Sequence, residues 1–534
     1  MLQHETRWRR LLSAAIFPLA LAIGPSSAMA QKTLSAVLHA DLKILDPIWT
    51  TADITRFFGF MVYDQLFAID AAGAIQPQMV DSYTVSKDEL FYTFKLRDGL
   101  KFHDGSPVTS ADALASLKRW GVRDGAGQIL NKFVKDMTAI DTQTLTITLN
   151  EPYSLVIDSL AKYSSLPAFI MPKKQADTDP QVAVTETNGS GPFKFVKSEW
   201  SPGNKVVFVR SSEYVPRKEA SSGFAGGKVV KVDRVEWVYI PDEQTQVSAL
   251  IRNEVDFLET PSVNLLSLLR KNPQIKIEPK DQVGSAGFLR LNHLHPPFNN
   301  VKARQAMLWI VDQDEILQAI SGADMSLARR CGAILLCGTP MANESGSEAL
   351  LSKAPKAVRY ANAKKLFDEA GYKGEPIILA EPSDIPTLHA AGVVLAQEMR
   401  EAGLNVDHQT MEWGALVTRR SKKDPPPIGW NLVITAGGPA NGNPAFAINQ
   451  AANCDQAWFG WPCDETLEKL RIDWAKAKTL EDRKRIAIDF QKRAMVSVPW
   501  IPYGQWIEPV AYRDTLSGFP DTPQTVVFWG VDKS

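Results

Sequence analysis

Two histidines offer the first candidate for chemistry, because a single residue separates His293 from His295. On a strand such a pair points to the same side, and imidazole is the commonest metal ligand in proteins. No carboxylate and no third histidine lies within short spacing of the pair. Two hypotheses therefore stand: a metal site, or two histidines satisfied by hydrogen bonds or solvent.

Motifs for covalent catalysis and for phosphate binding are missing from the chain. Neither G-x-S-x-G nor H-E-x-x-H occurs. In GFAGGKV, at 223–229, Val229 stands where a phosphate loop needs Ser or Thr to bind magnesium. NGSGPFKF, at 188–195, lacks the following Lys-Ser/Thr pair. We expect no catalytic residue, no bound metal, no cofactor and no enzyme; a secreted hydrolase is the rival class.

The chain has four cysteines, all in its second half: Cys331, Cys337, Cys454 and Cys463. An even number of cysteines indicates disulfides in an exported protein, and the N-terminal residues described next predict export. The simplest pairing joins sequence neighbours, Cys331 with Cys337 and Cys454 with Cys463. Four cysteines allow three pairings in all. The spacings C-x5-C and C-x8-C do not resemble the tight C-x2-C of zinc knuckles.

The first 30 residues have the three parts of a signal peptide. Arg7, Arg9 and Arg10 precede an apolar run at 11–24, which is too short to span a bilayer. The sequence Ala28-Met29-Ala30 predicts cleavage after Ala30 and location in the periplasm. Arg9-Arg10 leaves twin-arginine export as an alternative to the general route, and no cysteine at the cleavage point provides a lipid anchor.

Composition indicates a soluble globular protein of more than one domain, with 534 residues, 45% of them hydrophobic and 22% charged. Removing the first 30 residues, with three Arg and one Glu, leaves 56 basic and 59 acidic residues, a net charge of −3. No basic stripe is visible, which argues against nucleic acid or an anionic membrane surface as a partner.

The stretch FYTFKLRDGLKFHDGSPVTSADALASLKRW, at 91–120, organises the chain. Tyr92, Phe94 and Leu96 alternate with the polar residues at 93, 95 and 97, which predicts a strand with one buried face. Asp-Gly pairs at 98–99 and 104–105 predict turns around a short second strand at 100–103. Thr109 lies three residues before Asp112, as in a capping box, and Gly121 is the expected end of the helix that follows.

The run KLRDGLKFHDGSPVTSADALASLKR resembles the signature of the family 5 extracellular solute-binding proteins, which serve peptide, opine, oligosaccharide and nickel ABC importers. Three further segments resemble family elements: NGSGPF at 188–193, the crossing segment at 286–312 with Asn292, Pro297, Phe298, Arg304 and Asp312, and the helix YANAKKLFDEAGY at 360–372. The resemblance implies a periplasmic protein, expected to be a monomer, that captures a peptide-like or other small polar solute and delivers it to ABC permease subunits.

The resemblance also implies an α/β fold of two lobes that close on the ligand, with an extra subdomain inserted in the first lobe. We expect the signal peptide at 1–30 and the core of lobe I at 31–79, 188–290 and 503–534. The inserted subdomain is expected at 80–187 and lobe II at 291–502.

Ligands of two-lobed α/β proteins bind in the crevice at strand ends. Further strands are expected at 404–412, 430–436 and 499–506. The candidates are residues at the ends of these strands: Trp413, Gly438, Ala440, Asn441, Gln505 and Trp506, with Phe288 and Trp49 as further candidates. Dipeptide binders of the family hold the ligand ammonium with an Asp where this chain has Ala440. They hold the ligand carboxylate with an Arg where this chain reads Thr387-Leu388-His389-Ala390.

Losing both charged anchors predicts poor binding of free dipeptides, since each buried charge-assisted hydrogen bond contributes about 1.5–3 kcal/mol. A blocked or longer peptide, or a neutral polyhydroxyl compound, fits better. The alternative within the family is a nickel or metallophore binder, for which His293, His295 or His389 would be the candidate ligands.

Overall fold

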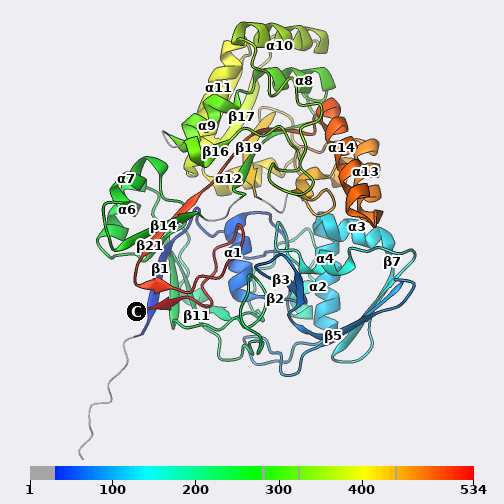
Figure 1. Ribbon diagram of the computed structural model, residues 1–534, viewed down its shortest axis with the longest axis vertical. Helices are drawn as coiled ribbons and strands as arrows, with labels where there is room; N and C mark the ends of the chain where they lie inside the picture. Colours follow the sequence, from blue (N-terminus) through cyan, green and yellow to red (C-terminus); the bar gives the residue numbers. More distant parts are fainter. Residues whose placement is uncertain (1–30, 280–282, 323–324, 439–441) are drawn as a thin grey trace, which may run out of the picture. The chain divides into compact units, whose positions relative to one another are not determined.

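The computed structural model describes residues 31–279, 283–322, 325–438 and 442–534 (Figure 1). Two large mixed sheets carry most of the strands. The fold is therefore α/β, as predicted, and helices cover both sheets.

The first large sheet has seven strands, in the order β10-β11-β12-β1-β13-β21-β14. Its central strand β1 runs parallel to both neighbours, β12 and β13, whereas the outer strands are antiparallel to theirs. The bounds are β1 Thr33–Val37, β10 Phe193–Phe195, β11 Lys205–Arg210, β12 Arg234–Val238, β13 Phe257–Leu258, β14 Ile275–Pro279 and β21 Pro509–Arg513. Helices α1 (Asp53–Val62), α6 (Glu243–Ile251) and α7 (Leu266–Leu269) belong to the same half of the chain.

The second large sheet has six strands, in the order β16-β20-β15-β19-β17-β18. Their bounds are β15 Ser285–Leu291, β16 Ala328–Arg329, β17 Ile377–Pro382, β18 Val406–Met411, β19 Leu432–Gly437 and β20 Trp500–Trp506. β17 is buried at every position, as expected of a strand paired in parallel on both sides. The helices here are α8 Val301–Ile310, α9 Gln313–Ser321, α10 Lys356–Ala370, α11 Pro386–Glu401, α12 Trp413–Arg420, α13 Glu465–Lys476 and α14 Leu480–Ser497.

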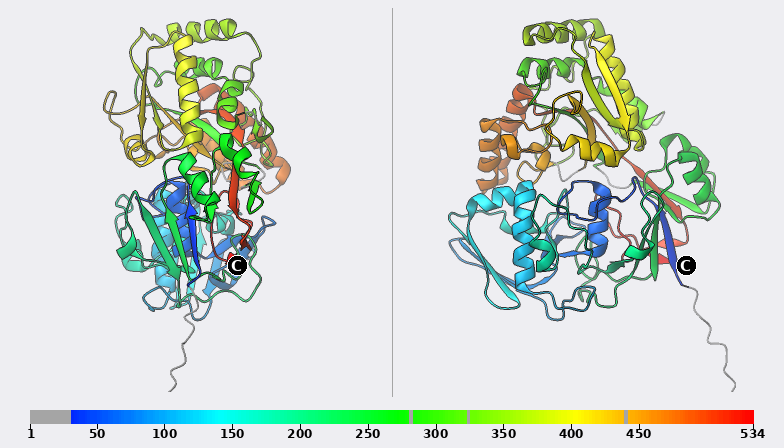
Figure 2. Two further views of the ribbon diagram at one scale, coloured as in Figure 1. Left: turned by 90° about the vertical axis from the view of Figure 1, so that its left-hand side faces the viewer. Right: turned by 180° about the vertical axis from the view of Figure 1, so that it is seen from behind.

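A four-stranded antiparallel sheet, in the order β5-β6-β8-β7, lies inside the predicted inserted subdomain. Its strands are β5 Val80–Val85, β6 Phe91–Leu96, β7 Val134–Ala139 and β8 Thr144–Leu149. Helix α2 (Ser110–Arg123) contacts β7 and β8, and α3 (Gly125–Phe133) follows it directly (Figure 2). Smaller elements complete the chain: β2 Asp64–Gln65 with β9 Phe169–Ile170, β3 Phe67–Ile69 with β4 Ile75–Pro77, β22 Leu516–Ser517 with β23 Asp532–Lys533, α4 Val156–Ala161 and α5 Lys173–Ala176.

The organising stretch is confirmed in its first strand and its helix start, and corrected in two places. Thr109 and Asp112 form the predicted capping box. The segment at 100–103 forms only a single bridge, between Lys101 and Pro107, instead of a strand. Helix α2 also runs past Gly121 to Arg123. A Cβ on Gly121 would lie 2.7 Å from the Asn131 side chain, so this glycine permits close contact with α3 instead of ending the helix.

His103 joins the organising stretch to the glycine-rich segment NGSGPF. Its ring Nε2 lies 3.0 Å from the carbonyl oxygen of Gly191, and its backbone N–H donates to the carbonyl of Gly189 at 2.8 Å. A Cβ on Gly189 would lie 1.9 Å from the carbonyl oxygen of Val62. The glycines of this segment therefore permit its close approach to the end of α1.

The chain passes between the two large sheets twice. β14 ends at Pro279 in the first sheet and β15 begins at Ser285 in the second; β20 ends at Trp506 in the second and β21 begins at Pro509 in the first. The expected lobe boundaries at 290/291 and 502/503 fall inside β15 and β20. We propose instead that the lobe boundaries lie after Pro279 and after Trp506, where the chain leaves each sheet.

Candidate functional site

A cavity of about 360 Å³ lies where the chain crosses between the two sheets. Both crossings contribute to its wall, through Gly284 and Ser285 and through Trp506 to Pro509. The first half of the chain adds residues from α1 and from the segment after β13, and the second half adds the start of α11, helix α12 and the end of β19 (Figure 1). Polar and aromatic groups from both halves therefore face one space.

The predicted binding residues separate into four groups. Phe288, Trp413, Gly438 and Trp506 line this cavity. Trp49 lines a second cavity of about 830 Å³, which shares the residues Thr51, Ile448 and Trp458 with the first. Gln505 lines neither cavity. Ala440 and Asn441 lie outside the described residues.

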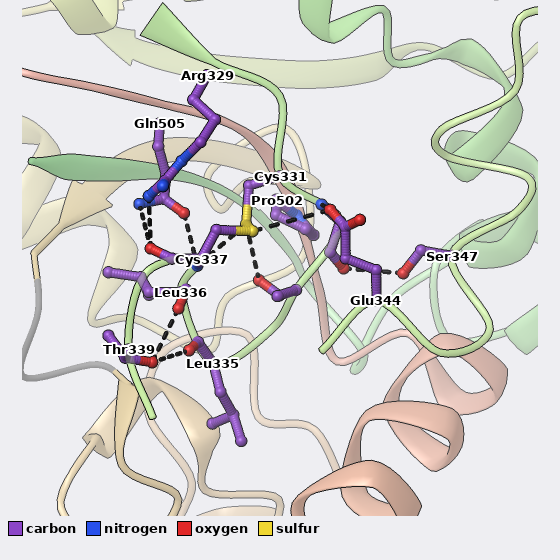
Figure 3. The surroundings of a disulfide bond; sticks show 12 residues. Arg329, Cys331, Leu335, Leu336, Cys337, Thr339, Glu344, Ser347, Pro502 and Gln505 are labelled. Atoms are coloured by element: carbon purple, nitrogen blue, oxygen red, sulfur yellow. Dashed lines mark hydrogen bonds between the residues drawn. A yellow bond between two sulfur atoms is a disulfide. The ribbon is translucent and has the colours of Figure 1, made fainter. Parts of the chain in front are cut away.

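Gln505 instead holds a disulfide-closed loop (Figure 3). Its Oε1 accepts the backbone N–H of Cys337 at 2.7 Å, and its Nε2 donates to the Cys337 carbonyl at 3.2 Å. Cys331 and Cys337 form one disulfide, and Cys454 and Cys463 form the other, which confirms both predicted pairings. Gln505 thus fastens the first loop to β20, the strand that delivers Trp506 to the cavity.

Sequence reasoning did not anticipate Arg420, the last residue of α12. Its side chain is 2% exposed and lines the cavity. Its guanidinium carbon lies 4.8 Å from the ring centroid of Trp413, 5.2 Å from that of Trp458 and 5.1 Å from that of Phe459. The sequence signal was the spacing of Trp413, Val417 and Arg420, which places all three on one face of a helix.

The guanidinium of Arg420 makes one long hydrogen bond, from Nη2 to the hydroxyl of Thr51 at 3.4 Å. Its Nε and Nη1 have no hydrogen-bond partner among the described residues. Burial lowers the pKa of Arg420 to about 9, an effect that the carboxylate of Asp53 partly opposes. The cation is thus held among aromatic rings with N–H groups left to donate.

Other cavity-lining side chains also carry buried polar atoms that lack a partner within the described part of the chain. The amide of Asn449, a residue 2% exposed, has neither Oδ1 nor Nδ2 bonded. The same holds for Nε2 of Gln524, Oγ of Ser165 and Nε1 of Trp458. Buried polar groups in folded proteins nearly always have partners, so this concentration at one cavity indicates a place built for a polar ligand.

Four acidic residues line the cavity, Asp53, Glu243, Glu259 and Glu508, and three of their carboxylates contact neighbouring side chains. Oε2 of Glu259 lies 2.7 Å from Nδ1 of His39. Asp53 pairs with Arg56 at 3.1 Å. Glu508 accepts the indole N–H of Trp506 at 3.0 Å. The cavity therefore combines three engaged carboxylates, of Asp53, Glu259 and Glu508, with the cation of Arg420, whose donors are largely unused.

The histidine pair does not line this cavity. Nε2 of His293 lies 3.3 Å from the carbonyl of Pro499, and Nε2 of His295 lies 2.9 Å from the carbonyl of Lys423. Burial lowers the pKa of His293 well below its usual value, which favours the neutral ring. His389 does line the cavity, and its Nδ1 lies 2.9 Å from the buried carboxylate of Glu381.

Comparison with known proteins identifies the class. The family described as "Bacterial extracellular solute-binding proteins, family 5 Middle" matches residues 74–457. The chain belongs to this family. A relative from Sinorhizobium fredii (strain NBRC 101917 / NGR234), named "Probable peptide ABC transporter periplasmic-binding protein y4tO", is 39% identical to this solute-binding protein over 516 residues, 95% of this chain and 94% of the relative.

More distant members share the whole length. The glutathione-binding protein GsiB of Escherichia coli (strain K12) is 23% identical over 523 residues, 95% of each chain. The structure of the murein tripeptide binding protein MppA of Escherichia coli superposes with a TM-score of 0.78 at 17% identity, covering 95% of this chain and 99% of MppA. The predicted two-lobed fold of the family is thereby confirmed. Among the described residues, no helix is both long and apolar enough to cross a membrane.

Proposed function

We propose that this family 5 protein is the periplasmic substrate-binding component of an ABC importer. It captures a peptide-like or other small polar solute in the cavity at the two crossings and delivers it to membrane permease subunits. The 39% identical relative, named as a probable peptide transporter component, supports this proposal over nearly the whole chain.

The observation that carries the proposal is the position of the cavity. Residues from both large sheets line it, and it adjoins the two short connections at which a hinge motion would occur. A solute that contacts both halves stabilises the closed arrangement, because it binds that state better than the open one. Closure excludes water and strengthens each polar contact with the solute.

Arg420 changes the prediction about the charge of the solute. The start of α11 lines the cavity and carries no arginine, in agreement with the reading of 387–390. Arg420 supplies a cation from α12 instead. The argument against a carboxylate-bearing solute, which rested on the missing arginine, therefore no longer applies, and a peptide-like solute with a free acid group fits the cavity.

The direct test is native mass spectrometry of protein purified from a bacterial periplasm without dialysis or denaturation. We expect one bound solute per chain, together with a mature N-terminus at Gln31 and a monomeric mass. If the wild-type protein carries no solute, a thermal-shift screen with peptides, opines and sugars follows. Failure of every compound to raise the melting temperature would contradict the proposal.

A further inference from the structure

Arg420 differs from the other deeply buried arginines of the described chain. Arg56, Arg119, Arg290, Arg304, Arg359 and Arg471 each donate at least one hydrogen bond of 2.8 Å or shorter to a carbonyl, carboxylate or hydroxyl oxygen. Arg513 uses both of its Nη atoms, at 3.3 and 3.5 Å. Within the described part of the chain, the only hydrogen bond that Arg420 donates is the 3.4 Å bond to Thr51.

The lack of short hydrogen bonds makes burial of the Arg420 cation unfavourable in free energy. A buried charge needs a counter-charge or hydrogen-bond acceptors, and three aromatic rings supply only part of that need. No carboxylate of the described residues forms an ion pair with Arg420, and Asp53, which influences its charge, already pairs with Arg56. The Nε and Nη1 atoms together carry three N–H donors, and the side chain lines the cavity.

We infer that Arg420 anchors a carboxylate of the transported solute. The rings of Trp413, Trp458 and Phe459 hold the guanidinium of Arg420 in place. The inference rests on the proposed function and specifies its substrate class: solutes with a free carboxylic acid. A single guanidinium matches a carboxylate in charge and planarity. A phosphate group carries up to two charges and would call for a second unengaged cation, whereas Arg56, the other arginine of the cavity, is already bonded to Ser164, Asp53 and the carbonyl of Gln524.

The hydrogen bond to Thr51 gives the guanidinium of Arg420 a second role, as a contact between the two halves of the chain. Thr51 precedes α1 in the first half of the chain, and Arg420 ends α12 in the second half. A carboxylate bound at Arg420 therefore lies beside a contact between the two halves. This explains physically why binding of the acid group would favour closure.

The test compares wild-type protein with Arg420→Gln, Arg420→Lys and a matched control, Arg419→Gln. Arg419 lies on the same helix and carries the same charge, but its guanidinium is bonded to the carbonyl oxygens of Gly429 and Pro427 and to Gln409, and it does not line the cavity. Each protein is stripped of solute, incubated with a peptone digest and desalted. The retained compounds are then identified by mass spectrometry before and after methyl esterification in acidic methanol.

We expect wild-type protein and Arg419→Gln to retain the same solute, with a mass shift that shows a free carboxylate. Arg420→Gln should bind it about a hundredfold more weakly, and Arg420→Lys should recover part of the affinity, because it restores the charge without the planar fork. Circular dichroism separates lost binding from lost folding; if Arg420→Gln is unfolded, the comparison of Arg420→Lys with wild-type protein decides.

Capture of a neutral or phosphorylated solute without a carboxylate overturns the inference and leaves the proposed function intact. Equal retention by folded Arg420→Gln and wild-type protein also overturns it. Failure of the wild-type protein to retain any compound from the digest counts against the proposed function itself, and the inference fails with it.

Discussion

The guanidinium of Arg420 lies against the ring of Trp413, with 4.8 Å between the guanidinium carbon and the ring centroid. The two residues are the first and last of helix α12, two turns apart on one face. Both line the cavity at the crossings between the sheets. One short helix thus delivers a cation and the aromatic surface that shields it from water.

Replacing Trp413 by Leu should weaken solute binding while the fold persists. The change removes a cation–π contact of about 0.5–2 kcal/mol and admits water beside Arg420, so the affinity should fall roughly tenfold. Calorimetric titration with the retained solute measures the change. An unchanged dissociation constant in a protein of unchanged melting temperature would show that the aromatic wall does not contribute.

Breaking the buried ion pair of Asp46 and Arg119 should destabilise the first half of the chain. Oδ2 of Asp46 lies 2.6 Å from Nη2 of Arg119, and both side chains are fully buried. Asp46→Asn leaves a buried cation without its counter-charge and should lower the free energy of unfolding by about 3–5 kcal/mol. Chemical denaturation measures it.

The matched control for Asp46→Asn is Asp368→Asn. It breaks the ion pair of Asp368 with Lys364, whose side chains are 60% and 69% exposed, respectively. Solvent screens such pairs, so this variant should unfold near the wild-type midpoint. Equal losses in both variants would contradict the assignment of stability to the buried pair.

Removing the disulfide between Cys331 and Cys337 should destabilise the loop that Gln505 holds. A bond that closes a loop with a sequence separation of 6 stabilises by about 2 kcal/mol through the entropy of the unfolded chain. The variant with both cysteines replaced by Ala should therefore melt earlier than wild-type protein without reductant. The disulfide would be irrelevant to stability if the two proteins melted together in oxidising buffer.

His103 should make the stability depend on pH. Burial lowers the pKa of His103 to about 4, from 6.5. The unfolded chain therefore takes up a proton before the folded chain does. Above about pH 6.5 His103 contributes fully to the free energy of unfolding. As the pH falls toward 4 this contribution is lost, which lowers the free energy of unfolding by on the order of 2–3 kcal/mol.

His103→Gln removes that titration and keeps a side chain able to donate to the Gly191 carbonyl. The difference in unfolding free energy between wild-type protein and the variant should shrink as the pH falls from 7 to 4.5. Urea denaturation at several pH values measures it. A difference that stays constant over this range would show that His103 does not titrate as a buried neutral ring.

Local patterns predicted much of the fold. The alternation at 91–96 became β6, and the capping box of Thr109 and Asp112 begins α2. Gly371, within the segment 360–372 that resembles a family helix, ends α10 in the left-handed conformation. These features depend on residues close in the sequence, whose backbone preferences act locally.

The residues of the site could be predicted less well from the sequence, because the site depends on contacts between distant segments. Gln505 was expected at the ligand, but its partner Cys337 lies on a loop 168 residues away. Gly121 was expected to end a helix, but its role depends on Asn131 of the next helix. The role of Arg420 depends in part on Trp458 and Thr51, which contact its side chain from distant parts of the chain.

The central claim is that the cavity at the crossings is the solute site, and a variant that fills it tests this claim most directly. Ala436, in β19, lines the cavity, so Ala436→Trp places an indole in the space of the ligand. The control is Val393→Trp, at a position 47% exposed on α11. In calorimetric titrations with the retained solute, wild-type protein and Val393→Trp should bind one equivalent, and Ala436→Trp, folded by circular dichroism, should bind none. Wild-type affinity in Ala436→Trp would contradict the account.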